Sequence, residues 1–129
     1  MILLDTHVLV WSQLEPRRLS RAATSALQRA GRAGGTAISV ISLVELANLF
    51  ARGRVDYSGN LEASLREYTE NVIILPITLD IAVLTAHFPP GFPSDPMDRI
   101  IAATARAEGV ALVTADERIQ ASPLVKTIW

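Results

Sequence analysis

The chain has 129 residues, of which half are hydrophobic and 19% are charged, and its formal net charge is −1. This composition excludes a disordered protein and argues against a passive nucleic-acid coat, which needs an excess of positive charge. The absence of cysteine excludes disulfides, thiolate metal sites and cysteine nucleophiles. No apolar run approaches the ~20 residues of a membrane span, and the first segment lacks a basic leader, so we expect a cytoplasmic protein.

Short, continuous apolar runs predict the strands. The first is ILL at residues 2–4, which ends at Asp5, and the last is KTIW at residues 126–129. Between them lie TAISV, VIIL and VALVT, at residues 36–40, 72–75 and 110–114. Runs of this kind, which do not alternate with polar residues, are typical of strands covered on both faces.

Helical segments separate the predicted strands. Ser20 and Gly31 have the residue types that begin and end a helix, and Asp95 followed by Pro96 is a second helix start. Helices are expected at residues 20–31, 42–53, 60–70, 78–88 and 96–108. Because strands alternate with helices, the sequence predicts one α/β domain with a parallel sheet.

Four acidic residues, distant in sequence, fall at one edge of such a sheet. The carboxyl ends of parallel strands and the amino ends of the following helices share an edge, where open α/β sheets bind their ligands. Asp5 ends the first strand, and Asp116 follows the strand at 110–114. Glu45 and Asp98 are expected in the first turns of two helices.

Each acid also has a purely structural interpretation. Asp5 and Asp116 are suited to capping the helices that follow them, and Ser42 with Glu45 fits a capping box. Two features favour a functional set instead. Asp98 shares a helix face with apolar residues three, four and seven positions later, so it is expected to point toward the packed side. Asp5 ends a strand expected to be central, where a carboxylate without a partner is unusual.

Electrostatics decides what four converging carboxylates would need. A helix cap contributes about 1 kcal/mol, whereas two like charges 4 Å apart at an effective dielectric near 20 repel by roughly 4 kcal/mol. Converging carboxylates therefore need protonation or a divalent cation. Oxygen ligands with no cysteine and no histidine pair favour Mg²⁺ or Mn²⁺ over zinc. Such an ion suits phosphoryl chemistry, because it activates water and stabilises a departing oxygen.

The four acids lie in segments with a family resemblance. LLDTHVLVW, ISLVELANL, SDPMDRIIAATA and ALVTADERI resemble, in order and spacing, the four acidic motifs of the PIN-domain family, and most closely those of VapC-like toxins. DPMDRIIAATA followed by LVTAD is the most specific part. The resemblance covers essentially the whole chain. It implies a single PIN-like domain over residues 1–129, a three-layer α/β/α sandwich with a mostly parallel sheet of four to five strands.

The resemblance also implies a function, that of a Mg²⁺- or Mn²⁺-dependent endoribonuclease that acts as the toxin of a toxin–antitoxin pair. It carries the metal-binding and catalytic roles onto Asp5, Glu45, Asp98 and Asp116. By the same match, the residues expected to support these acids or contact substrate are Thr6, Asp95, Arg99 and Thr114. Such toxins act on RNA, form homodimers and are neutralised by a small antitoxin whose tail enters the acidic groove.

The sequence does not settle the roles of several other residues. Pro93 stands where many relatives carry a histidine. His87 is expected to end a helix, and His7 either touches substrate or packs on the first helix. Trp11 and Trp129 are interpreted as core or interface residues. A rim of arginines is predicted to steer phosphate although the net charge is near zero; its candidates are Arg17, Arg18, Arg52, Arg54 and Arg99.

Two other functions are considered. A phosphoryl-transfer domain with Asp5 as the nucleophile would need a second acid directly before Asp5 or an aspartate two positions after it, and neither stands there. A non-catalytic binding module would keep the fold and only engage a partner. The presence of all four motif acids argues against that second alternative.

Overall fold

The strands form one parallel sheet. The computed structural model describes residues 1–55 and 59–129, and within them the sheet has five strands in the order β3-β2-β1-β4-β5, each pair parallel. The strands are β1 (Ile2–Leu4), β2 (Thr36–Ser39), β3 (Ile73–Leu75), β4 (Leu112–Val113) and β5 (Thr127–Ile128). The predicted parallel sheet is therefore confirmed, with some strands shorter than expected. As predicted for the strand that ends at Asp5, β1 is central.

The helices follow the predicted segments closely. They are α1 (Thr6–Leu14), α2 (Arg21–Ala30), α3 (Val40–Ala51), α4 (Leu61–Thr69), α5 (Leu79–Thr85), α6 (Pro96–Glu108) and α7 (Glu117–Gln120), with a 3-10 turn, η1, at Pro16–Arg18. Ser20 caps α2 by accepting a hydrogen bond from the Ala23 backbone N–H. The end of α6 is set by Gly109, whose φ of 65° lies in the left-handed region that glycine favours. None of the described helices is long and apolar enough to traverse a lipid bilayer.

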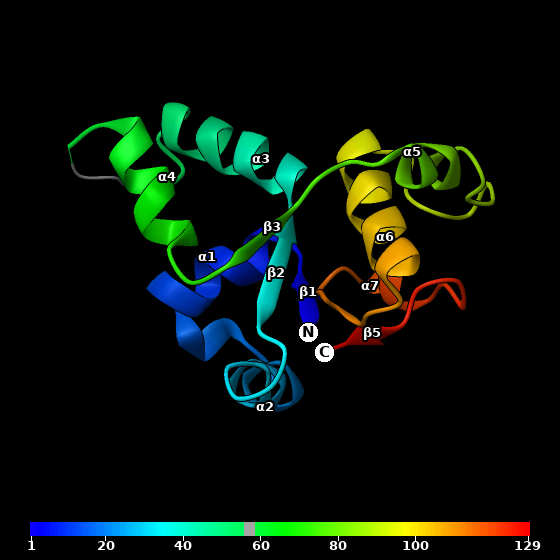
Figure 1. The fold of residues 1–129 in the computed structure, drawn as a ribbon, viewed down its shortest axis with the longest axis horizontal. Helices are drawn as coiled ribbons and strands as arrows, with labels where there is room; N and C mark the ends of the chain where they lie inside the picture. The colour runs from blue at the N-terminus through cyan, green and yellow to red at the C-terminus, as the bar shows by residue number, and fades with distance from the viewer. Residues whose placement is uncertain (56–58) are drawn as a thin grey trace.

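Helices cover both faces of the sheet, so the architecture is the expected α/β/α sandwich (Figure 1). On one face pack α1, α2, α3 and α4, and on the other pack α5, α6 and α7. Successive residues of a strand point to opposite faces. Accordingly, Leu3 belongs to the cluster of buried residues around α6, and Leu4 belongs to the cluster around α1 and α3.

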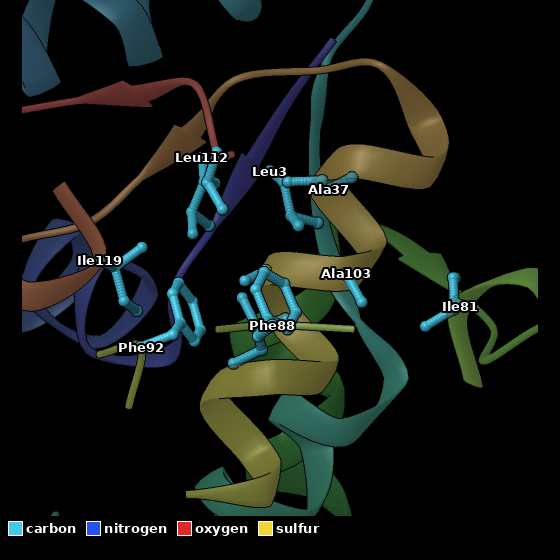
Figure 2. Packing of buried hydrophobic residues seen from close by; sticks show 12 residues of the cluster. Leu3, Ala37, Ile81, Phe88, Phe92, Ala103, Leu112 and Ile119 are labelled. Carbon is cyan, nitrogen blue, oxygen red and sulfur yellow. The ribbon is translucent and has the colours of Figure 1, made fainter. Parts of the chain in front are cut away.

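The packing beneath α6 fixes the position of that helix. Figure 2 shows Leu3, Ala37 and Leu112, from three neighbouring strands, facing the same cluster as Phe88 and Phe92. The two phenylalanine rings are stacked with their centroids 4.1 Å apart. On α6 itself this cluster contains Ile101 and three small buried alanines, at positions 102, 103 and 105. The helix therefore lies close to the sheet, and its first turn is held in place.

The start of α3 differs from the prediction. The capping box of Ser42 and Glu45 was wrong, because α3 begins at Val40 and Ser39 caps it by accepting a hydrogen bond from the Ile41 backbone N–H at 3.2 Å. Two serines three residues apart fit a cap equally well by type, and the strand ends at the earlier one. Glu45 consequently lies in the second turn of α3, and Ser42 is buried inside the helix.

Candidate active site

A pocket lies at the carboxyl edge of the sheet, beyond the ends of β1 and β4. Its volume is about 410 Å³, and α1, α3 and α6 contribute to its walls. Five carboxylates line it: Asp5, Glu45, Asp95, Asp98 and Asp116. The parallel topology has thus brought together acids that are more than 100 residues apart in the chain. We call this cavity the acidic pocket.

Asp5 uses its two carboxylate oxygens for different tasks. Oδ1 accepts a hydrogen bond from the Thr6 backbone N–H at 2.9 Å, which caps α1. Oδ2 accepts the hydroxyl proton of Thr114 at 2.7 Å. The residue is only 5% exposed, and the exposed part faces the acidic pocket. The capping interpretation and the pocket interpretation of Asp5 therefore both describe its geometry.

A chain of two hydroxyl groups holds Glu45. The Thr6 hydroxyl donates to Glu45 Oε1 at 2.6 Å and lies 2.9 Å from the Ser42 hydroxyl oxygen. Because Thr6 has one hydroxyl proton, which goes to the carboxylate, Ser42 donates to Thr6. Burial raises the pKa of Glu45, and the negative charges of Asp5 and Asp95 raise it further, whereas the Thr6 hydrogen bond lowers it. A carboxylate with a raised pKa is suited to accepting a proton near neutral pH.

Asp98 is the acid most strongly affected by its surroundings. Burial raises the pKa of Asp98 to about 7, together with the negative charges of the other acids of the pocket. Asp98 lies on the first turn of α6, with Asp95 as the cap that accepts from the Met97 backbone N–H at 2.9 Å. The pKa of Asp98 is therefore raised first by its burial and then by four neighbouring carboxylates.

Asp116 is joined to Asp5 through Thr114. Its carboxylate caps α7 by accepting from the Arg118 backbone N–H at 2.9 Å, which confirms the predicted cap. Its own backbone N–H donates to the Thr114 hydroxyl oxygen at 3.1 Å. Since the same hydroxyl donates to Asp5, Thr114 fixes the relative positions of two acids that come from neighbouring strands.

His7 links α1 to the loop after β4. Its Nε2 accepts a hydrogen bond from the Ala115 backbone N–H at 3.0 Å, and its Nδ1 lies 3.6 Å from Asp5 Oδ2. Burial lowers the pKa of His7, although Asp5 and Asp116 act in the opposite direction. The neutral ring therefore carries its proton on Nδ1. The sequence left two roles open, and His7 both lines the acidic pocket and packs on Trp11, with ring centroids 4.8 Å apart.

Arg99 does not point into the acidic pocket. Its Nε donates to the Pro93 carbonyl at 2.8 Å and its Nη1 to the Thr85 carbonyl at 3.4 Å, so it braces the loop before α6. Of the predicted arginine rim, Arg52 is the member that lines the acidic pocket in the described part of the chain. His87 Nδ1 lies 2.9 Å from the Val83 carbonyl, next to the end of α5 as expected.

Sequence reasoning missed Asn48 and Leu49, which line the acidic pocket from α3. Ser42, Glu45 and Asn48 are spaced by three, and Leu49 and Arg52 continue the row toward the end of the helix. Residues three and four apart lie on one face of a helix, so the position of Glu45 alone could have identified Asn48 and Leu49 as pocket residues. Met97, directly before Asp98, is a further lining residue that the sequence did not indicate.

The donor set of the acidic pocket fits a hard divalent cation. Carboxylate oxygens are the ligands that Mg²⁺ and Mn²⁺ prefer, and five carboxylates line this pocket. In residues 1–55 and 59–129 no group of three or more acidic or histidine side chains is drawn close enough together to hold an ion as it stands. A divalent cation would offset the repulsion that arises when these carboxylates come together.

The model of the PIN domain matches residues 2–123 of the chain. The chain belongs to the PIN-domain family. Among curated proteins, this PIN-domain chain is similar to ribonuclease VapC22 of Mycobacterium tuberculosis, with 38% identity over 99% of the chain and 98% of the relative. The family resemblance expected from the four motifs is thereby confirmed.

Solved structures with the same fold come from several bacteria. VapBC2 from Rickettsia felis, bound to a DNA fragment from its promoter, matches with a TM-score of 0.74 and 20% identity, covering 98% of this chain and 97% of that one. A toxin–antitoxin complex from Klebsiella pneumoniae matches with a TM-score of 0.68 and 24% identity, covering 97% and 95%. At these identities the likeness concerns the fold alone, which is that of the PIN-domain family.

Proposed function

We propose that this PIN-domain chain is a Mg²⁺- or Mn²⁺-dependent endoribonuclease, the toxin component of a toxin–antitoxin pair. The observation that carries the proposal is the gathering of Asp5, Glu45, Asp98 and Asp116 around one pocket. The similar protein VapC22 is named a ribonuclease, and a fold neighbour is a toxin–antitoxin complex, which supports the same assignment. A nuclease of this kind acts where cellular RNA is, so we place it in the cytoplasm.

The roles of the acids follow from their surroundings. Asp5 and Asp98 would be the principal ligands of the ion, with Asp116 and Glu45 completing the site. When bound, such an ion activates water and neutralises charge on the phosphate. Glu45, with its raised pKa, accepts the proton of the attacking water. Thr6 orients Glu45, and Thr114 holds Asp5 and Asp116 in a fixed relation.

A small antitoxin would neutralise the enzyme by filling the acidic pocket. The pocket attracts positive charge, because five carboxylates line it. A partner whose tail carries a basic side chain would compensate the same charge that a cation does. Bound antitoxin and bound cation are therefore expected to compete.

We also propose that the chain forms a homodimer through the edge of its sheet. Five large aliphatic residues are exposed there and form what we call the apolar strip: Ile73, Ile74, Ile77, Leu79 and Val83. β3 is the last strand of the sheet, and from it the chain continues to α5 (Figure 1). Edge strands usually carry charges that prevent association, but residues 71–79 contain none. A second copy of the chain would cover the strip.

Cleavage of RNA by the purified protein tests the enzymatic proposal. Magnesium or manganese should support cleavage and a chelator should stop it. Asp98→Asn should lower the rate at least a hundredfold, because it removes one ligand charge while preserving shape. The matched control is Asp80→Asn, an exposed acid in the first turn of α5 that does not line the pocket, and it should behave as the parent. Unchanged cleavage by Asp98→Asn would refute the proposal.

One observation favours the non-catalytic alternative enough to require its own test. The carboxylates do not stand in a ready coordination shell in the described residues. Calorimetric titration with Mn²⁺ separates the two functions. An enzyme of the proposed kind binds Mn²⁺ in a manner that depends on Asp5 and Asp98 and then cleaves RNA. A binding module shows neither behaviour.

A further inference from the structure

A smaller pocket adjoins the acidic pocket, between α1 and the end of α3. Its volume is about 220 Å³, and His7 and Leu49 line both cavities. Its walls are largely apolar, and three charged side chains also line it, the two cations Arg18 and Arg54 and the anion Glu15. We call it the α1–α3 pocket. Any extended ligand that has one residue in the acidic pocket can place its next residue here.

Flat groups are layered against this pocket. The ring of His7 packs on Trp11, and Arg18 Cζ lies 4.0 Å from the centroid of the Trp11 ring. The Arg18 side chain is 52% exposed, so much of its guanidinium surface is open to a ligand. A guanidinium plane of this kind stacks on a nucleobase as readily as on an aromatic side chain. A base could therefore lie on the side of the Arg18 guanidinium that faces away from Trp11.

The charges of the α1–α3 pocket complement those of the acidic pocket. The ion pair of Arg18 with Glu15, at 3.7 Å, is long and exposed, and such pairs are weak. No carboxylate of the described segments forms an ion pair with Arg54. Arg52 lines the acidic pocket two positions before Arg54. These arginines therefore offer positive charge to a phosphate backbone that the acids alone would repel.

We propose that the α1–α3 pocket binds one nucleotide of single-stranded RNA next to the nucleotide that is cut, with its base on Arg18 and its phosphate beside Arg54. This inference rests on the proposed ribonuclease function. The size of the pocket favours a single flat group, because 220 Å³ corresponds to roughly 6 Å on a side, whereas a helix of a protein partner is about 10 Å wide. Arg18 and Arg54 thereby become substrate-binding residues.

Binding of a defined probe tests the charge contribution. The probe is a fluorescein-labelled, 12-nucleotide single-stranded RNA of random sequence in magnesium, and the protein carries Asp98→Asn to prevent turnover. Adding Arg18→Gln or Arg54→Gln should weaken binding about tenfold each. The control is Arg32→Gln, an exposed arginine after α2 that lines neither pocket, and it should weaken binding less than twofold. Equal losses for all three substitutions would overturn the proposal.

Removal of single bases tests the stacking contribution. A fixed-sequence RNA that binds is prepared as a series, each member lacking the base at one position. At one position the missing base should weaken binding about tenfold, and Arg18→Gln should abolish that difference because the base has lost its contact. The penalty of Arg54→Gln should persist without the base, since that contact is to phosphate.

The outcomes separate this inference from the function on which it rests. If the parent protein cleaves RNA but base removal acts equally on the parent and on Arg18→Gln, the nucleotide site is wrong and the ribonuclease stands. If Arg18→Gln weakens binding of a protein partner and leaves RNA binding unchanged, the pocket belongs to that partner. If the parent neither binds nor cleaves RNA, both proposals fail. Thermal unfolding of each variant confirms that it is folded.

Discussion

Single carboxylates in this protein both cap helices and line the pocket that we propose as the active site. Asp5 and Asp116 cap helices and line the acidic pocket with the same side chains. A cap needs one acceptor oxygen directed at a backbone N–H, which leaves further lone pairs of the carboxylate for the pocket. Finding a good cap in a sequence is therefore no argument against a functional role for the same residue.

The raised pKa of Asp98 predicts a stability that depends on pH. The pKa is about 7 in the folded state against an ordinary value of 3.8, so the folded state holds the proton more tightly than the unfolded state. Stability should therefore fall as pH rises from about 4 to about 7, and the loss is complete above that range. Without divalent ions, Asp98→Asn should unfold at a higher temperature than the parent at pH 8, and at a similar temperature at pH 4.

Comparison of the two proteins at each pH isolates Asp98. His7 has a lowered pKa, so its effect has the opposite sign and destabilises the fold as pH falls below about 6.5. That effect is common to both proteins. Adding Mn²⁺ at pH 8 should stabilise the parent and not Asp98→Asn. A parent that is as stable as Asp98→Asn at pH 8 without metal would contradict the interpretation.

The hydroxyl chain to Glu45 predicts a graded effect on activity. Thr6→Val removes the 2.6 Å hydrogen bond to Glu45 and keeps the shape of the side chain. A hydrogen bond to a charged group contributes roughly 1.5–3 kcal/mol, so kcat/KM for RNA cleavage should fall by about tenfold or more. Thr6→Ser retains the hydroxyl and should retain most of the activity. If Thr6→Ser is as impaired as Thr6→Val, the methyl packing and not the hydroxyl is what matters.

At the scale of the element, α6 determines where Asp98 stands. Its buried alanines allow the helix to approach the sheet, and the layer beneath it contains Leu3, Leu112 and Phe88. Packing in such a layer is close to that of a crystal and leaves little room for larger side chains. The position of Asp98, one of the proposed catalytic acids, is therefore set by residues that do not line the pocket.

Enlarging one of these alanines should displace the helix. Ala103→Leu adds volume to a fully buried position, and overpacking of this kind costs about 1–3 kcal/mol of stability. Urea unfolding measures the loss. Ala107→Leu, on the exposed side of the same helix, is the control and should change stability by less than about 0.5 kcal/mol. Equal effects of the two substitutions would show that α6 is not tightly packed.

The limits of a helix were predicted well where the sequence marked both of its ends. The limits of α2 and α6 followed from a cap at one end and a glycine at the other. The start of α3 was missed because Ser39 and Ser42 carry the same signal. The gathering of four acids at one edge of the sheet was predicted from the parallel topology alone, because that prediction requires no knowledge of side-chain conformation. The direction of Arg99 depends on the path of a loop, and no periodicity encodes that.

At the scale of the whole molecule, the apolar strip exposes large aliphatic side chains to solvent. Leu79 is 81% exposed and Val83 is 50% exposed. Ile73, Ile74 and Ile77 are each more than 40% exposed, so a second copy of the chain that covers the strip would remove apolar side chains from water. Burying it against a second copy would remove an edge that otherwise promotes aggregation.

Dimer formation can be tested at this strip. The parent should have about twice the mass of the 14.0 kDa chain by light scattering, and Leu79→Glu combined with Val83→Glu should be monomeric, because charges would be buried without partners. Leu124→Glu, at an exposed leucine outside the strip, is the control and should remain dimeric.

A mixture of variants tests the symmetry of the contact. In a two-fold interface the same surface patch meets itself. Chains with Glu at positions 79 and 83 should therefore pair with chains that carry Lys at both positions. A parent that is monomeric at 100 µM, or a mixture that does not pair, would reject the strip as the dimer interface.

The crowding of five carboxylates around one pocket has a consequence for the lifetime of the chain in a cell. The cation or basic partner that we propose would relieve their repulsion, so a chain that has lost both should open more often. Proteases degrade proteins mainly from opened states. Copies without a ligand are then removed first, and the abundance of the protein follows the supply of whatever fills its pocket.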